Sequence, residues 1–163
     1  MTETKAIKEG DAIKVLFLEA SLEYVFENEL LPFPIKIEGK VYRINERNNV
    51  IRIIDYKTGK VVPNTLKVNN FDGLTNDLKN KKVIQLLCYA MMLQNNEILQ
   101  DKSLQAGIVS FKSMKEAFMP FGLGKGKTSE KEINSETIEL FKSELLHLIS
   151  EILDKEIPFK EKN

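Results

Sequence analysis

The segment Gly39–Gly59, which reads GKVYRINERNNVIRIIDYKTG, decides the fold of this chain. Apolar and polar residues alternate as the segment begins, Asn48–Asn49 interrupts the alternation, and a run rich in β-branched residues follows. Alternation with a period of two is typical of a strand, and two turn-forming residues between two such runs are typical of a tight hairpin. The pattern therefore predicts a β-hairpin over about residues 35–57.

The turn also predicts which side chains face each other. If Asn48–Asn49 forms a two-residue turn, residues equally distant from it are opposite each other, which places Tyr42 opposite Asp55. Asp55 and Lys57 are two residues apart on one strand, so their side chains leave the same face about 7 Å apart along the backbone. A carboxylate and an ammonium group are therefore expected to meet beside Tyr42.

Three segments show the apolar spacing of helices, at about residues 11–29, 77–95 and 137–155. In the segment 77–95, apolar residues cover well over half of the helical circumference, as expected for a helix packed on a sheet. A short apolar strand candidate follows at residues 105–111. Together with the hairpin, these elements predict an α/β fold, and a length of 163 residues favours one domain over residues 1–163.

The composition narrows the possible partners and sites. Basic and acidic side chains are equal in number, at 24 each, so any surface for nucleic acid must be a local patch. Cys88 is the only cysteine, which excludes an intramolecular disulfide and an iron–sulfur cluster held by this chain. No apolar run approaches the ~20 residues of a membrane span. We expect a cytoplasmic protein with no membrane partner.

The hairpin motif and a second motif at Gln85 and Tyr89 together resemble the PD-(D/E)XK nuclease superfamily. The specific resemblance is to the C-terminal nuclease domain of RecB/AddB-type helicase-exonucleases, whose motifs read Gly-x-x-Asp-Arg-Ile-Asp, Asp-Tyr-Lys-Thr-Gly and Gln-x-x-x-Tyr. This chain matches them at Gly39, Asp55, Lys57, Gln85 and Tyr89. The resemblance runs from about residue 7 to the end and implies a restriction-endonuclease-like mixed central sheet with flanking helices.

The resemblance also implies a chemistry and partners. In the family, two aspartates bind a divalent metal, a lysine orients or activates the attacking water, and the Gln/Tyr helix supports the site and approaches the DNA. Carried over, Asp55 and the Tyr56 carbonyl would bind Mg²⁺ or Mn²⁺, Lys57 would position water, and Gln85 and Tyr89 would complete the site. The implied partners are DNA and a helicase or helicase-exonuclease subunit in recombination-repair.

The chain departs from the family pattern at the first aspartate, which falls on Tyr42, and at a further acid, which falls on Asn45. A phenol with an ordinary pKa near 10 is a poor Mg²⁺ ligand at neutral pH. Glu19, on the expected first helix, is the best remaining acid for a second metal ligand. Two functions therefore stay open: a nuclease-type domain of weakened activity, and an inactive DNA-binding or scaffolding module of the same fold.

Simpler interpretations stand beside these. Without its surroundings, the Asp55–Lys57 pair would be an ordinary ion pair, worth at most ~1 kcal/mol if exposed. The glycine-rich segment 122–128 lacks the first glycine of a phosphate-binding loop, because Phe121 occupies that position. Its lysines fit a solvated loop better than a phosphate site, and the only histidine, His147, is interpreted as an ordinary residue of the last helix.

Overall fold

The computed structural model describes residues 12–112 and 117–159. A five-stranded sheet, with the strand order β1-β2-β3-β5-β6, forms its centre, and a two-stranded sheet of β4 and β7 lies apart from it. The strands are β1 (Ile13–Phe26), β2 (Ile35–Arg47), β3 (Val50–Lys57), β4 (Lys67–Val68), β5 (Ser103–Ser110), β6 (Met119–Pro120) and β7 (Gly122–Leu123), and the α-helices are α2 (Lys81–Leu93) and α3 (Ser135–Leu153).

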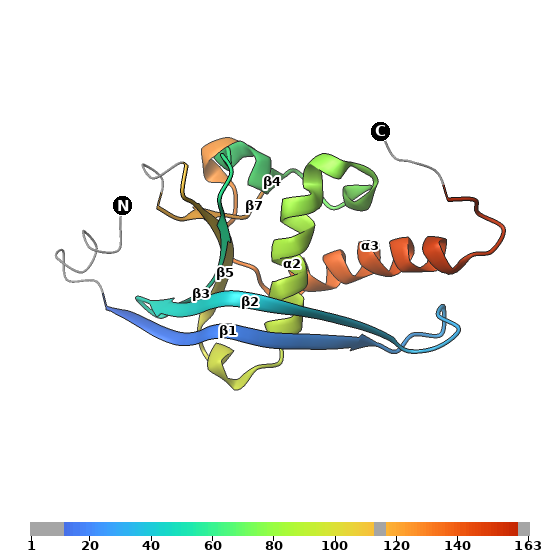
Figure 1. Ribbon diagram of the computed structural model, residues 1–163, viewed down its shortest axis with the longest axis horizontal. Helices are drawn as coiled ribbons and strands as arrows, with labels where there is room; N and C mark the ends of the chain where they lie inside the picture. The colour runs from blue at the N-terminus through green and yellow to red at the C-terminus, as the bar shows by residue number, and fades with distance from the viewer. Residues whose placement is uncertain (1–11, 113–116, 160–163) are drawn as a thin grey trace.

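The central sheet is mixed, as the resemblance implied. The strands β1, β2 and β3 pair antiparallel in chain order, β3 pairs with β5 in parallel, and β6 pairs antiparallel with β5. Helix α2 connects the two parallel strands and lies against the sheet, while α3 runs away from it toward the connection between β1 and β2 (Figure 1). The predicted α/β class and mixed sheet are confirmed.

The hairpin of β2 and β3 turns where the sequence predicted. Asn48 and Asn49 both have positive φ angles, of 50° and 63°. Two successive residues of this kind make the turn whose twist matches that of the flanking strands, and asparagine tolerates the conformation better than most residues. The strands pair from Arg43 opposite Ile54 to Arg47 opposite Val50, so the predicted register is confirmed.

The expected helix at about residues 11–29 is wrong, because this segment forms strand β1. β1 pairs with β2 along its length, and the register shifts between Val15 and Phe17. Farther along, Glu19 has a positive φ of 54°. Such irregularities interrupt the strict alternation of a strand, so the apolar residues recur at intervals that resemble a helix. The long pairing partner β2 decided the conformation.

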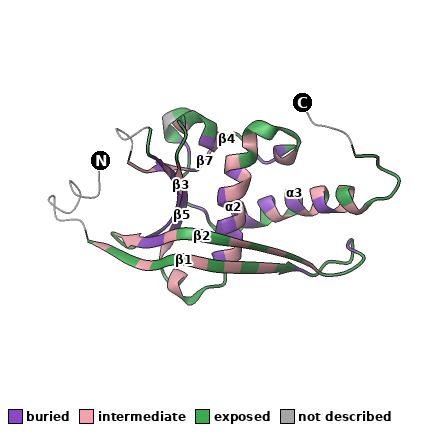
Figure 2. Ribbon diagram, in the orientation of Figure 1, coloured by how far each residue is buried: buried purple, intermediate pink, exposed green. Residues whose placement is uncertain are grey.

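The core lies between the sheet and the two helices, as the buried stretches of α2 and of the central strands show in Figure 2. The other two predicted helices are confirmed with small shifts of their ends. Asn134 caps α3, because its side chain accepts a hydrogen bond from the Thr137 backbone at 2.8 Å. The largest side chains with almost no exposure include Ile44, Ile51, Ile53, Leu86, Leu87, Leu93, Ile108, Phe121 and Phe141.

The segment between β3 and α2 contains short 3₁₀ turns at Pro63–Leu66, Leu74–Asn76 and Leu78–Asn80. Leu66 and Leu74 are buried, so the connection packs onto the core at these points. The helices within residues 12–112 and 117–159 are too short or too polar to span a lipid bilayer.

Candidate active site

The residues with predicted chemistry gather at the carboxyl end of β3, where the parallel strands β3 and β5 end together. Asp55 pairs with Ile108 and Lys57 with Ser110 in this ladder. Only 2% of Asp55 is exposed, although the strand ends two residues later. A buried carboxylate requires compensation of its charge, and the neighbouring lysine supplies it.

Asp55 and Lys57 form an ion pair. Nζ of Lys57 lies 2.8 Å from Oδ2 of Asp55, which confirms that the two side chains share a face of the sheet. The angles of this contact do not direct a hydrogen bond, and within residues 12–112 and 117–159 the buried Oδ2 accepts none. The carboxylate therefore presents an oxygen that is neutralised by Lys57 but is not saturated by donors.

The lysine is held from its other side by α2. Nζ of Lys57 donates to Oε1 of Gln85 at 2.9 Å, and Nε2 of Gln85 donates to the hydroxyl of Tyr89 at 2.9 Å. Gln85 and Tyr89 are one turn apart on the helix and so lie on the same face. The structure thus brings all four predicted residues into one chain of polar contacts, from Asp55 through Lys57 and Gln85 to Tyr89.

Gly39 permits β2 to approach this chain. A β-carbon on Gly39 would lie 3.3 Å from Cε1 of Tyr89 and 3.2 Å from Cε of Met92, closer than most such contacts. A larger residue would therefore press on Tyr89, which is buried. The glycine of the hairpin motif has a packing reason that the sequence alone did not give.

Tyr42 lies one residue beyond Arg43–Ile54, the last pair between β2 and β3, so the predicted pair of Tyr42 with Asp55 is not among the pairs that these strands form. It is 52% exposed, in contrast to the buried aspartate. The resemblance implied a metal-binding carboxylate at this position, where the structure has an exposed phenol. Asn45, the other departure from the motif, pairs with Arg52 and lies farther along the hairpin.

Glu19 lies on strand β1 rather than on a helix, between the pairs Leu18–Arg43 and Ala20–Val41. Its carboxylate accepts a hydrogen bond from Nζ of Lys40 at 2.7 Å. This hydrogen bond, with the charge of Lys40, lowers the pKa of Glu19. Strand β2 separates β1 from β3, which puts their backbones roughly 10 Å apart. The structure therefore does not bring Glu19 to Asp55.

The donors around Asp55 fall short of the metal centre that the family implies. Hard cations bind several oxygen ligands, and the unsaturated Oδ2 of Asp55 is one such ligand. Among the residues that the structure describes, however, no group of three or more acids, histidines or cysteines could hold a metal ion. With Glu19 bound to Lys40 and a phenol at Tyr42, neither of these two positions supplies a second carboxylate to Asp55.

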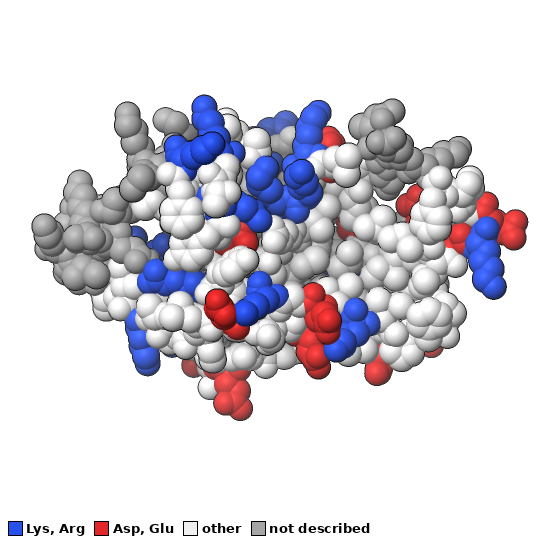
Figure 3. All heavy atoms as spheres, viewed as in Figure 1, with Lys and Arg blue, Asp and Glu red and all other residues white. Residues whose placement is uncertain are grey.

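A basic pocket of about 510 Å³ opens beside Lys57, at the beginning of α2. Lys60, Lys81 and Lys82 line it, and none of these three has an ion pair or a hydrogen bond within the described ranges. Figure 3 shows basic side chains gathered over this part of the molecule. The adjacent pair Lys81–Lys82 at a helix start was the available signal, and the sequence analysis missed it.

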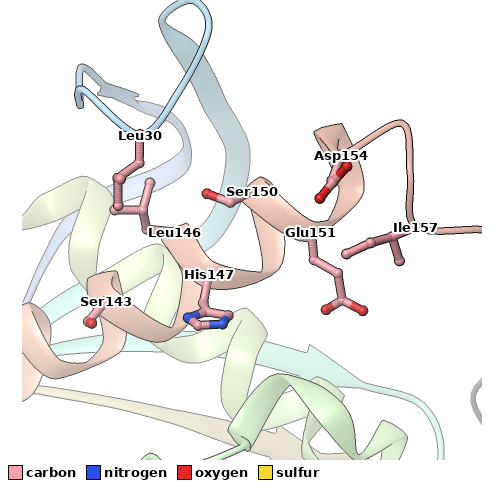
Figure 4. A pocket seen from close by; sticks show the side chains of 8 residues that line it. All are labelled: Leu30, Ser143, Leu146, His147, Ser150, Glu151, Asp154 and Ile157. Atoms are coloured by element: carbon pink, nitrogen blue, oxygen red, sulfur yellow. The ribbon is translucent and has the colours of Figure 1, made fainter.

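A second pocket, of about 500 Å³, lies on α3, away from β3. Leu30, from the connection between β1 and β2, reaches toward Leu146, and His147 and Glu151 follow along the helix (Figure 4). The residues of this pocket form no cluster of three metal ligands in the parts of the chain described. His147 lines this pocket and not the one beside Lys57.

One comparison with known proteins gives a result for nearly the whole chain. The family model of the PD-(D/E)XK nuclease superfamily matches residues 2–163. No curated protein and no solved structure matches the chain. The family match therefore covers β1 to α3, including every residue of the candidate site.

Proposed function

The chain belongs to the PD-(D/E)XK nuclease superfamily, and on this premise we propose that it is a DNA-processing nuclease-type domain with weakened hydrolysis. The context we propose is a recombination-repair helicase-exonuclease, because the motifs at Asp55–Gly59 and at Gln85 and Tyr89 follow the RecB/AddB pattern. The observation that carries the proposal is the chain of contacts from Asp55 to Tyr89 at the edge of a basic pocket.

The basic pocket supports binding of the DNA backbone. Lysine side chains that neutralise phosphates release condensed counterions, and this release supplies most of the sequence-independent affinity for DNA. Lys60, Lys81 and Lys82 have no partner within the described residues, so their charges are available to phosphates. A phosphodiester bound there would lie beside Lys57, the residue proposed to position the attacking water.

Hydrolysis is proposed to be weak because one carboxylate is missing. In the family, a divalent cation supplies the charge stabilisation for phosphodiester cleavage. In this chain Asp55, with the Tyr56 carbonyl beside it, is the proposed ligand set, and Tyr42 adds no negative charge at neutral pH. Lys57 also neutralises Asp55 directly, which lowers the attraction of the carboxylate for a cation.

The same observations favour a second candidate, an inactive DNA-binding or scaffolding module. A buried carboxylate that is fully neutralised by Lys57 can serve as a structural ion pair, and the basic pocket can bind DNA without cleaving it. Binding and cleavage therefore have to be measured separately on the same variants.

The test compares the unmodified chain with Tyr42→Asp, which restores the carboxylate, and with Tyr42→Asn, which removes the phenol without adding charge. We expect single-stranded and duplex DNA to stay largely intact with the unmodified chain and Tyr42→Asn in Mg²⁺ or Mn²⁺. Tyr42→Asp is expected to cleave measurably, by at least about tenfold over the unmodified chain, since about 1.4 kcal/mol of transition-state stabilisation suffices for that factor.

The controls separate the two candidates. Adding Lys57→Ala to Tyr42→Asp should abolish the gained cleavage. Robust cleavage by the unmodified chain that Lys57→Ala removes would refute the weakened site. A Tyr42→Asp variant that binds Mn²⁺ and DNA but cleaves nothing would favour the scaffolding module instead.

A further inference from the structure

An aromatic pair of one half-buried and one exposed side chain, Tyr56 and Phe111, lies at the carboxyl ends of β3 and β5. Tyr56 stands between Asp55 and Lys57 on β3, so its side chain leaves the opposite face of the sheet. Its ring stacks on that of Phe111, with centroids 5.8 Å apart and planes 8° from parallel. Phe111 is 58% exposed.

The position of Phe111 is fixed to the site by backbone contacts. Its N–H donates to the carbonyl oxygen of Lys57 at 3.0 Å. The hydroxyl of the preceding Ser110 donates to the Gly59 carbonyl at 2.7 Å, while the Lys112 N–H donates to that hydroxyl at 3.3 Å. The backbone that carries this exposed ring is thus hydrogen-bonded to the backbone of Lys57.

The partner ring is also fixed. Nη1 of Arg43 donates to the hydroxyl of Tyr56 at 3.3 Å, which restrains the tyrosine from its far end. Phe111 therefore rests on a ring that is itself held, and among the residues that the structure describes Phe111 keeps 58% of its surface exposed. Burial of the phenylalanine in the core does not explain this arrangement, because more than half of the residue stays in contact with solvent.

We propose that the Tyr56–Phe111 pair stacks an unpaired base of a single DNA strand that crosses the carboxyl end of β3, from the basic pocket of Lys57, Lys60 and Lys81 on the α2 side to the opposite face of the sheet. The combination of a basic groove and aromatic side chains is what sequence-independent binding of single strands requires. Bases in a duplex already stack on each other, so the pair offers them no comparable contact. The inference rests on the proposed function and specifies the form of DNA that the site would bind, a single-stranded end or region.

The first measurement is DNA affinity by fluorescence anisotropy with three labelled ligands: a thymidine oligomer, an abasic oligomer of equal length and a blunt duplex. Phe111→Ala should weaken binding of the thymidine oligomer about tenfold and change binding of the other two less than about twofold. Phe33→Ala is the matched control, because Phe33 is 55% exposed but lies in the connection between β1 and β2.

The second measurement uses the absence of tryptophan from the sequence. Phe111→Trp places a single fluorescent indole at the proposed platform and should retain affinity for the single strand. We expect the thymidine oligomer to quench this fluorescence and the abasic oligomer to leave it unchanged. Phe33→Trp should respond to neither ligand.

The outcomes distinguish this inference from the function on which it rests. Equal loss of affinity for all three ligands in Phe111→Ala, or no loss for any, would overturn base stacking while leaving DNA binding in place. Failure of the unmodified chain to bind any of the ligands would overturn both. Circular dichroism of each variant checks that the fold is kept.

Discussion

At the residue scale, the ion pair between Asp55 and Lys57 sets how much positive charge the site offers to a polyanion such as DNA. The aspartate neutralises Lys57, which lines the basic pocket and donates a hydrogen bond to Gln85. Lys60, Lys81 and Lys82 keep their full charge. The site is therefore attractive to phosphate at its rim and nearly neutral at its centre.

Replacing Asp55 by asparagine should strengthen DNA binding, because Lys57 would then contribute its charge to the pocket. We expect the dissociation constant for a single strand to fall about threefold at low salt, with a steeper dependence on salt since one more phosphate is neutralised. Titrations at two salt concentrations measure both effects. Glu19→Gln is the matched control, because it also removes a carboxylate, which pairs with Lys40 on the neighbouring strand. Unchanged or weaker binding by the Asp55 variant would contradict the proposed role of Lys57.

At the element scale, the hairpin turn and the glycines set the strand positions on which the site depends. Gly107 on β5 shows the tightest approach, since a β-carbon there would lie 2.5 Å from the carbonyl oxygen of Met119 on β6. Gly39 likewise permits a close, though less close, approach between β2 and α2. The turn at Asn48–Asn49 sets the register in which β2 pairs with β3.

The strain in the turn can be measured at Asn49, whose φ is 63°. Asn49→Ala and Asn49→Gly both lose the side-chain hydrogen bond to the Asp101 carbonyl, so their difference isolates the backbone. Because alanine resists a left-handed conformation that glycine adopts freely, the glycine variant should be more stable by about 1 kcal/mol. Urea unfolding of the two variants gives this difference. Equal stabilities would mean that the turn relaxes to another conformation.

At the scale of the whole molecule, equal numbers of acidic and basic residues leave the attraction for DNA to a local patch.

The burial of α2 against the sheet affects the titration of its side chains as well as their packing. Desolvation in this layer raises the pKa of the Cys88 thiol to about 11 from an ordinary value of 9.0. The folded protein therefore keeps a proton that the unfolded chain releases between these two values.

This difference predicts a stability that depends on pH. Below pH 9 the neutral thiol is the stable form in both states, and as pH rises toward 11 the unfolded chain gains from losing the proton. We expect the Cys88 contribution to fall by about 2 kcal/mol across that window. Denaturant unfolding of the unmodified chain and of Cys88→Ala at pH 8.5 and 10.5 measures it, and the variant should lose less stability. Parallel losses would show that the thiol is more hydrated than its place on α2 implies.

The sequence by itself determined the features that depend on neighbouring residues. The asparagine pair fixed the hairpin register, the period of two put Asp55 and Lys57 on one face, and helical spacing put Gln85 and Tyr89 on one side of α2. Each of these follows from backbone geometry over a few residues, which any folded context preserves. For that reason Asp55, Lys57, Gln85 and Tyr89 lie together in the structure as predicted.

Tertiary structure decided what depends on segments far apart in the chain. Pairing with β2, together with the shift near Leu16, made residues 13–26 a strand where local spacing favoured a helix. The same pairing set Glu19 against Lys40, while packing brought Lys60 to Lys81 and Phe111 to Lys57. No local sequence pattern predicts these contacts, because each depends on hydrogen bonds with, or burial against, a strand or helix elsewhere in the sequence.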